Sequence, residues 1–159
     1  MTRPASAGIL LFRVVDGRLE VLLAHPGGPW FARQDAGSWT IPKGEPAPGE
    51  IVTDAGLLSV AQREFAEETG SAPASGPTIP LGSITQAGGK AVHAWAVEGD
   101  LDPATAHSNS FAMEWPPGSG RLAEFPEVDR LAWFDLAEAR RRIRPAQAPL
   151  LDRLRRAIG

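Results

Sequence analysis

The residues best suited to chemistry form one short acidic stretch, REFAEETG, at residues 63–70. Because each helical residue advances roughly 100° around the axis, Glu64, Glu67 and Glu68 fall on one side of the predicted helix. Like charges this close repel one another, and a divalent cation removes that penalty. Mg²⁺ and Mn²⁺ prefer oxygen ligands, so this face predicts a site for one of them. The alternative is a solvated helix face with an ordinary Arg63–Glu67 pair.

The loop before this helix, PKGEPAPGE at residues 42–50, brings complementary groups. Its prolines exclude regular structure over most of its length. Gly44 allows close backbone approach, and Lys43 is a candidate for binding phosphate. Glu45 and Glu50 add two further carboxylates. Cation, glycine and acids therefore converge next to the acidic helix face.

These two segments resemble the signature of the Nudix hydrolases, which reads Gly, five residues, Glu, seven residues, then Arg-Glu-aliphatic-any-Glu-Glu-any-Gly-aliphatic. Gly44 and Glu50 match the first half, and the second half is matched by Arg63, Glu64, Phe65, Glu67, Glu68 and Gly70. Twelve residues separate Glu50 from Arg63, which implies an insertion of five within residues 51–55. Phe65 and Ser71 also depart from the usual aliphatic residues. The likeness extends over most of the chain and is strongest to a bacterial subgroup of small predicted NTP pyrophosphohydrolases.

The resemblance implies a metal-dependent hydrolase that cleaves a pyrophosphate bond in a nucleoside diphosphate linked to another group. Nucleoside triphosphates, ordinary or oxidised, dinucleoside polyphosphates and nucleotide sugars all remain open as substrates. The alternative is a nucleotide-binding or regulatory Nudix module whose catalysis the insertion has weakened. A module that binds RNA through the basic run ARRRIR, residues 139–144, is a third hypothesis. The alternative for this run is a solvated helix face, and the net negative charge argues against nucleic acid as a partner.

The resemblance also implies roles for individual residues. Metal ligands are expected among Glu64, Glu68, Glu67, the Gly44 carbonyl and Glu50, with Mg²⁺ or Mn²⁺ as the cofactor. The insertion leaves the register of Glu50 open, so Asp54 or Glu45 is an alternative acid, and Glu127 in the late FPEVD segment is another. Catalytic roles are assigned to Glu64, as the base that deprotonates or orients water, and to Glu67 and Arg63, the latter holding a carboxylate in place.

Substrate contacts are expected from residues on loops. The cations Lys43, Arg33, Lys90 and Arg121 are candidates for phosphate contacts, and Trp30 and Phe31 for stacking on a base. His25, His93 and His107 share no metal-ligand spacing and are not assigned to metal.

The elements that must position these residues follow from local patterns. Asp16-Gly17 between residues 7–15 and 18–24 predicts a β-hairpin. Strands are also predicted at 39–41, 80–86, 91–98, 111–115 and 131–134, the second and third joined by a turn at 87–90. The acidic helix is capped by Thr53 or Asp54, ends at Gly70, and buries Leu58, Ala61 and Phe65. Two further helices are predicted at 135–143 and 149–158.

Mixed strands and helices predict an α/β (α+β) fold, a Nudix-like α/β/α sandwich with the signature helix on a mixed sheet. The 159 residues suit a single domain, 1–159.

The composition, 43% hydrophobic and 22% charged, is that of a globular chain rather than a disordered one. The chain contains no cysteine, and this excludes disulfides and thiolate metal sites. The early apolar run is too short for a membrane span or a signal peptide, so we expect a cytoplasmic protein with no membrane partner, and a homodimer is compatible with the sequence.

Overall fold

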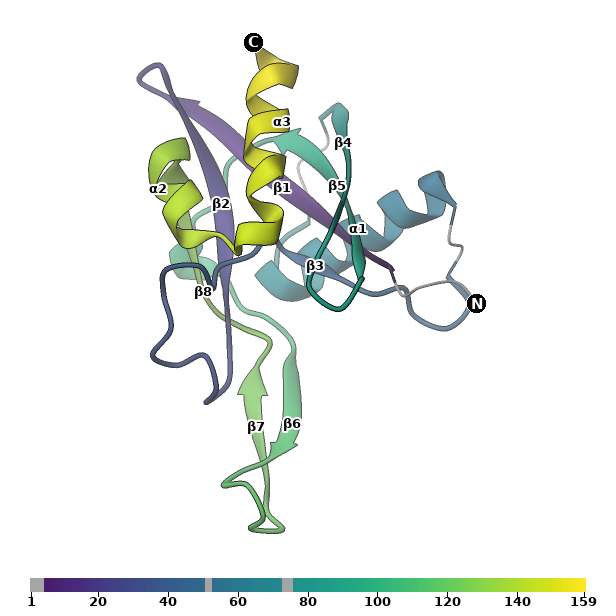
Figure 1. Cartoon of the computed structure of the whole chain (residues 1–159), viewed down its shortest axis with the longest axis vertical. Helices are drawn as coiled ribbons and strands as arrows, with labels where there is room; N and C mark the ends of the chain where they lie inside the picture. Colours follow the sequence, from purple (N-terminus) through teal and green to yellow (C-terminus); the bar gives the residue numbers. More distant parts are fainter. Residues whose placement is uncertain (1–4, 51–52, 73–75) are drawn as a thin grey trace.

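The computed structural model describes residues 5–50, 53–72 and 76–159, and within them a six-stranded mixed sheet forms the centre of the molecule (Figure 1). Its main path runs, in spatial order, through β4 (Thr78–Thr85), β5 (Ala91–Glu98), β1 (Ala5–Val15), β2 (Arg18–Pro26) and β8 (Val128–Asp135). The short strand β3 (Lys43–Gly44) pairs with β1 beside this path. β1 and β5 are parallel, and the other pairs are antiparallel.

The first hairpin, β1–β2, is formed as predicted. Asp16 and Gly17 both have positive φ, 51° and 76°. A two-residue turn of this kind matches the right-handed twist of the strands that it joins. The register is fixed by pairs such as Val15 with Arg18 and Phe12 with Val21.

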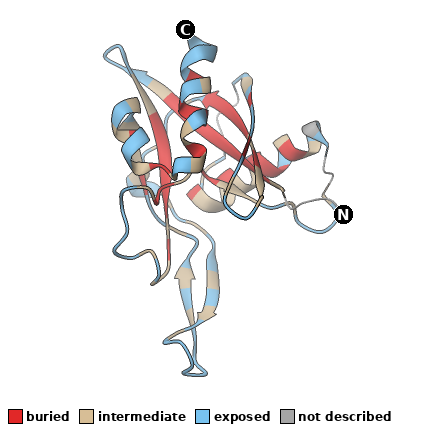
Figure 2. Ribbon diagram, in the orientation of Figure 1, coloured by how far each residue is buried: buried red, intermediate tan, exposed pale blue. Residues whose placement is uncertain are grey.

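Helices cover both faces of the sheet. The signature helix α1 (Asp54–Thr69) packs on one face, and α2 (Leu136–Arg142) and α3 (Ala148–Ile158) pack on the other (Figure 1). Side chains alternate along β1, so that Leu10 and Phe12 join the core under α2 and α3, while Ile9 and Leu11 join the core under α1. Figure 2 shows the buried residues concentrated in the central strands and the inner faces of the helices. The predicted α/β/α arrangement is confirmed.

Helix α1 carries the acidic stretch. Thr53 caps its start by accepting a hydrogen bond from Gly56 N, and Gly70 ends it with φ 75°. The buried row differs from the one predicted: Leu58 is only half-buried, and Leu57 and Val60 join Ala61 and Phe65 in the core. Positions 57, 60, 61, 64 and 68 follow the spacing of one helix face. Glu64 and Glu68 therefore continue the core-facing row towards the end of the helix.

Two predicted strands differ from the structure. Residues 39–41 form only isolated bridges, Ala24 with Thr40 and Trp39 with Ile143, and the short strand instead follows at Lys43–Gly44. The late loop holds a second hairpin, β6 (Ser110–Glu114) with β7 (Leu122–Pro126), of which only the first strand was predicted. This hairpin projects from the body of the molecule (Figure 1).

The C-terminal helices begin close to the predicted positions. Asp135 caps α2 by accepting a hydrogen bond from Glu138 N, and a 3-10 turn, η2 (Pro145–Gln147), leads into α3. Another 3-10 turn, η1 (Pro103–Thr105), follows β5. Among the described residues, no helix has both the length and the apolar character needed to cross a membrane.

Candidate functional site

An acidic cavity of about 430 Å³ lies where α1, β3 and the base of the β6–β7 hairpin meet. Its wall contains four glutamates, Glu64, Glu67, Glu68 and Glu127, together with Glu45 from the loop after β3. Lys43, Gly44, Pro46 and Asn109 complete it. The structure thus brings together the three glutamates of the helix and the late acid predicted in the FPEVD segment.

Arg63 holds the acidic face together. Its Nη1 donates to Glu64 at 3.0 Å and to Glu67 at 2.9 Å. Its Nε and Nη2 donate to the two carboxylate oxygens of Glu50 at 3.0 and 2.6 Å, and Nη2 also reaches the Glu45 carbonyl. A guanidinium presents its donors in a rigid planar fork, so it can fix several acceptors at once. Arg63 therefore contacts the carboxylates that it was predicted to position, and the positioning role itself stays a prediction.

Glu50 is not among the residues that line the acidic cavity. Both of its oxygens accept from Arg63, and Oε1 also accepts from Ala47 N. These hydrogen bonds, those from Arg63 first, lower the pKa of Glu50. Glu50 therefore fixes the position of the Arg63 guanidinium. It does not line the cavity, whereas the predicted ligands Glu64, Glu67 and Glu68 do. The predicted insertion within residues 51–55 falls partly outside the described residues.

Gly44 makes room for Glu64. A Cβ at position 44 would lie 2.1 Å from both Cδ and Oε2 of Glu64. Antiparallel pairing with β1, Ala7 with Gly44 and Gly8 with Lys43, sets the position of this backbone. The Glu64 carboxylate therefore lies directly against the bare backbone of β3, as the close approach predicted for Gly44 requires.

Burial changes the proton affinity of the groups inside the cavity. It raises the pKa of Glu68 to about 8, and the nearby Glu64 charge adds to the effect. Burial also raises the pKa of Glu64, although the Arg63 charge opposes it. Lys43 shows the opposite change: burial lowers its pKa, and the positive charges of Lys90 and Arg144 act in the same direction. Arg63, bonded chiefly to Glu50, has its pKa raised further above the usual range.

The raised pKa of Glu68 predicts a pH-dependent stability in metal-free protein. Between the ordinary pKa of a glutamate and about 8, folded Glu68 holds a proton that the unfolded chain releases, so the stability from this group is complete below about pH 4 and is lost as the pH rises through 8. Glu68→Gln keeps the neutral form at every pH. In EDTA we expect this variant to exceed the wild type in free energy of unfolding by roughly 2–4 kcal/mol at pH 9 and to equal it near pH 4.

Urea unfolding at several pH values measures this difference. Glu98→Gln, at the exposed end of β5, is the matched control and should follow the wild type throughout. A Glu68→Gln advantage that does not grow with pH would contradict the buried, protonated state of Glu68.

The base of the β6–β7 hairpin supplies another part of the cavity wall, through Asn109 and Glu127. Asn109 N donates to the Glu67 carbonyl at 3.0 Å, and Glu127 N donates to the Asn109 carbonyl at 2.8 Å. These backbone bonds tie the end of α1 to both ends of the hairpin. Sequence reasoning missed Asn109, because no local pattern connects it to residues more than forty positions earlier.

The other predicted site residues are spread over the surface. Lys90 forms an ion pair with Glu45, and this contact lowers the pKa of Glu45. Arg33 is exposed on the loop after β2, and Arg121 lies at the far end of the hairpin, with its carbonyl accepting from Trp115 N. Trp30 is 59% exposed and packs edge to face on Trp115. The side chain of Asp54 lies outside the described residues.

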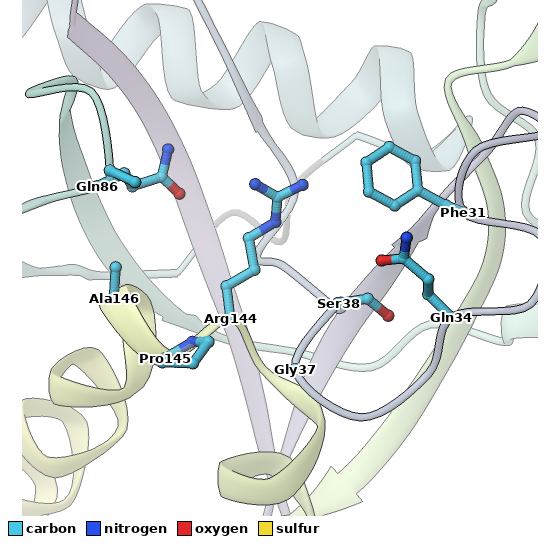
Figure 3. A pocket seen from close by; sticks show the side chains of 9 residues that line it. Phe31, Gln34, Gly37, Ser38, Gln86, Arg144, Pro145 and Ala146 are labelled. Carbon is cyan, nitrogen blue, oxygen red and sulfur yellow. The ribbon is translucent and has the colours of Figure 1, made fainter.

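Phe31 lines a second cavity of about 570 Å³, shown in Figure 3. The loop after β2, the β4–β5 turn and the α2–α3 connection form its walls. Its lining residues are Phe31, Gln34, Gly37, Ser38, Gln86, Ala87, Arg144, Pro145 and Ala146. The sequence patterns singled out Phe31 from this set, placed Arg144 only within a basic run, and gave no signal for Gln86.

The donors around the acidic cavity fit a hard divalent cation. All of its acidic groups are carboxylates, which Mg²⁺ and Mn²⁺ prefer, and Gly44 leaves room beside Glu64. Glu64 and Glu67 are paired with Arg63. Among the described residues, no group of three acidic or imidazole side chains is already arranged as a coordination shell. Cation binding would therefore require these side chains to rotate.

Comparison with known proteins places this geometry in a family. The NUDIX domain model matches residues 2–154. No curated protein sequence matches the chain. Among solved structures, the NUDIX domain of NrtR from Shewanella oneidensis, complexed with ADP ribose, has a TM-score of 0.66 at 16% identity, covering 100% of this chain and 90% of that one. Ap4A hydrolase from C. elegans has a TM-score of 0.61 at 21% identity, covering 98% and 97%.

A mutT/nudix family protein from Listeria innocua shares the fold at a TM-score of 0.62 and 18% identity, covering 99% of this chain and 96% of that one. These likenesses agree with the α/β/α arrangement, and the family match agrees with the enzyme class predicted from the sequence, a Nudix pyrophosphohydrolase. The match to the family model spans nearly the whole chain, and the chain therefore belongs to the NUDIX domain family.

Proposed function

We propose that this chain hydrolyses a pyrophosphate bond in a nucleoside diphosphate linked to another group, and that it needs Mg²⁺ or Mn²⁺ to do so. The observation that carries the proposal is the convergence of Glu64, Glu67, Glu68 and Glu127 with Lys43 around one cavity. Without positive charge nearby, this many carboxylates would repel one another. A cation bound among them offsets this repulsion.

The helix glutamates are the proposed ligands. Glu64 and Glu68 project from the core-facing row of α1, and Glu67 lies beside them, closer to solvent. The Gly44 carbonyl and Glu127 are further oxygen donors at the same cavity. When bound, the cation supplies positive charge against the nonbridging oxygens of the diphosphate.

The chain's own residues then have separate tasks. Lys43, on the cavity wall, contacts phosphate as a cation. Glu64 orients the attacking water and takes its proton. Arg63 keeps Glu64 and Glu67 in place from outside the cavity, as its hydrogen bonds to both carboxylates indicate.

A substrate panel tests the proposal. Nucleoside triphosphates, a dinucleoside tetraphosphate and a nucleotide sugar are incubated with the protein and Mg²⁺ or Mn²⁺, and the phosphate-containing products are separated by ion exchange. We expect turnover of at least one substrate, its loss in excess EDTA, and its recovery when Mg²⁺ is restored. A folded protein that turns over none of them with either metal would refute the proposal.

A nucleotide-binding or regulatory module is the second candidate function. Its support is the likeness to the NUDIX domain of NrtR, whose structure contains ADP ribose. Adding ADP ribose to the panel, with a binding measurement beside the turnover assay, separates the two functions, because tight binding without turnover at any metal concentration would favour the module.

A further inference from the structure

The second cavity contains an arginine without a partner. Its neighbours on α2 are all paired: Arg140 with Asp152, Arg141 with Glu138, and Arg142 with both Glu138 and Asp35. Within residues 5–50, 53–72 and 76–159, the Arg144 guanidinium makes neither an ion pair nor a hydrogen bond. It lies between Gln86 and Phe31 in the view of Figure 3, 5.8 Å from the centre of the Phe31 ring. A half-buried cation in this setting has donors available for a ligand.

A chain of buried amides sets the direction of Gln86. The backbone N–H of Ile41 can only donate, so the Gln147 atom that it meets at 3.1 Å is the amide oxygen. The Gln147 nitrogen must then be the donor to Gln86, and it reaches Gln86 Oε1 at 2.9 Å. The free end of the Gln86 amide is therefore its nitrogen, a second donor on the wall of the cavity. Gln147 is fully buried, so this orientation is well fixed.

The remaining walls suit a flat, partly apolar group. The ring of Phe31 stands on one side, and Ala87, Pro145 and Ala146 add apolar surface. A volume of about 570 Å³ is within the range of small-molecule sites and much larger than a phosphate requires. Gln34, whose nitrogen donates to the Trp30 carbonyl, leaves its oxygen as one acceptor. The cavity therefore combines an aromatic face, the donors of Arg144 and Gln86, and the acceptor oxygens of Gln34 and Ser38.

The lining of the second cavity comes close to that of the acidic cavity. Arg144 lies close enough to Lys43, on the wall of the acidic cavity, for their charges to interact. A nucleotide whose phosphates pass Lys43 can extend its base towards Arg144.

We propose that the second cavity binds the base of the substrate and selects a 6-oxopurine, such as guanine, over adenine. Arg144 pairs well with the O6 and N7 acceptors of guanine, whereas adenine presents a donor at the 6-position. With adenine, the N–H donors of Arg144 would face the N–H donors of the 6-amino group. One of the two groups would then have no hydrogen-bond partner, and this lowers the affinity. Phe31 contributes a stacking surface that either base can use. This inference rests on the proposed function, because it names the substrate class of the same site.

Binding of GMP and AMP to the full chain in EDTA, measured by isothermal titration calorimetry, tests the inference without metal or turnover. We expect the wild type to bind GMP roughly 10-fold more tightly than AMP. Arg144→Gln should remove most of this difference by weakening GMP. Phe31→Leu should weaken both nucleotides by roughly 5-fold or more and leave their ratio unchanged. Arg141→Gln, in the same basic run but paired on the surface, is the matched control and should bind like the wild type.

Equal affinities for GMP and AMP, no measurable binding of either, or GMP binding that Arg144→Gln leaves unchanged would each overturn the inference. The proposed function fails separately. A chain that prefers GMP through Arg144 but hydrolyses none of the panel keeps the inference and refutes the hydrolase. A chain that hydrolyses GTP and ATP equally well, and whose Arg144→Gln variant binds GMP normally, keeps the hydrolase and refutes the inference.

Discussion

Glu68→Gln and Glu64→Gln should each lower kcat/KM by about 10³-fold, or about 4 kcal/mol of transition-state stabilisation. Each variant keeps the size of the side chain but removes a charged oxygen that the proposed cation needs. Both side chains lie on the core-facing row of α1, and the Glu64 side chain is only 14% exposed. Glu67→Gln should cost less, since Glu67 is 38% exposed and water has access to its position.

Steady-state rates on the best substrate of the panel measure these losses, with Glu98→Gln as a control that should retain wild-type activity. Unfolding in urea at the same pH shows that the variants are folded. Because Glu68→Gln is expected to stabilise the metal-free protein, lost activity together with raised stability would mark a functional effect. Wild-type rates in both variants would rule out the helix glutamates as the site.

The same variants separate ligand from base. A variant that has lost mainly metal affinity recovers part of its rate at high Mg²⁺, because the cation then fills a weakened site by mass action. We expect this recovery for Glu68→Gln. Glu64→Gln should stay slow at saturating Mg²⁺, since it also loses the group proposed to take the proton from water.

Much of the frame was predictable because its signals are local. Asp16-Gly17 determines a tight turn through the positive φ of two adjacent residues, and Thr53 and Gly70 bound α1 through contacts within one turn. The spacing of Glu64, Glu67 and Glu68 likewise guaranteed a common helix side. Each of these features depends on residues at most four positions apart.

The features that the sequence patterns failed to predict depend on contacts between residues far apart in the chain. The second hairpin lies in a segment whose Pro and Gly residues indicate a loop, and its strands form because β6 pairs with β7. The short strand at Lys43–Gly44 exists because β1 lies beside it. Glu50 could not be assigned from the signature, because its two bonds to Arg63 cross a segment of unusual length. Sequence spacing carries no information about such contacts.

The contrast among the arginines has the same origin. The pattern ARRRIR, residues 139–144, predicts the same role for all four arginines, which is a solvated basic face. The fold pairs three of them with Glu138, Asp152 and Asp35, and turns Arg144 into a cavity against Phe31. Asp35 and Phe31 are more than a hundred residues away from these arginines in the chain. The distinction therefore belongs to the tertiary structure.

Gly44→Ala is expected to lower kcat/KM by about 10²-fold while leaving the free energy of unfolding nearly unchanged, because the added Cβ would occupy the place of the Glu64 carboxylate, 2.1 Å away. That carboxylate is the far end of a flexible side chain, so it can turn aside at little cost. Gly8→Ala makes the contrast: its Cβ would meet Pro42 O at 2.6 Å, a backbone atom that cannot turn aside, and that variant should lose stability.

A double-mutant cycle shows whether Gly44→Ala acts through Glu64. If the only role of the bare backbone is to admit that carboxylate, adding Gly44→Ala to Glu64→Gln should slow the enzyme by less than about 3-fold beyond Glu64→Gln alone. Among the described residues, the atom nearest to a Cβ at position 76 would be Glu98 O at 3.8 Å, an ordinary van der Waals distance, so Gly76→Ala should behave like the wild type. Fully additive losses in the cycle would mean that Gly44 contributes something other than room for Glu64. The Gly44 carbonyl, a further proposed oxygen donor to the cation, would then be the group to examine, since the added methyl group shifts the backbone that carries it.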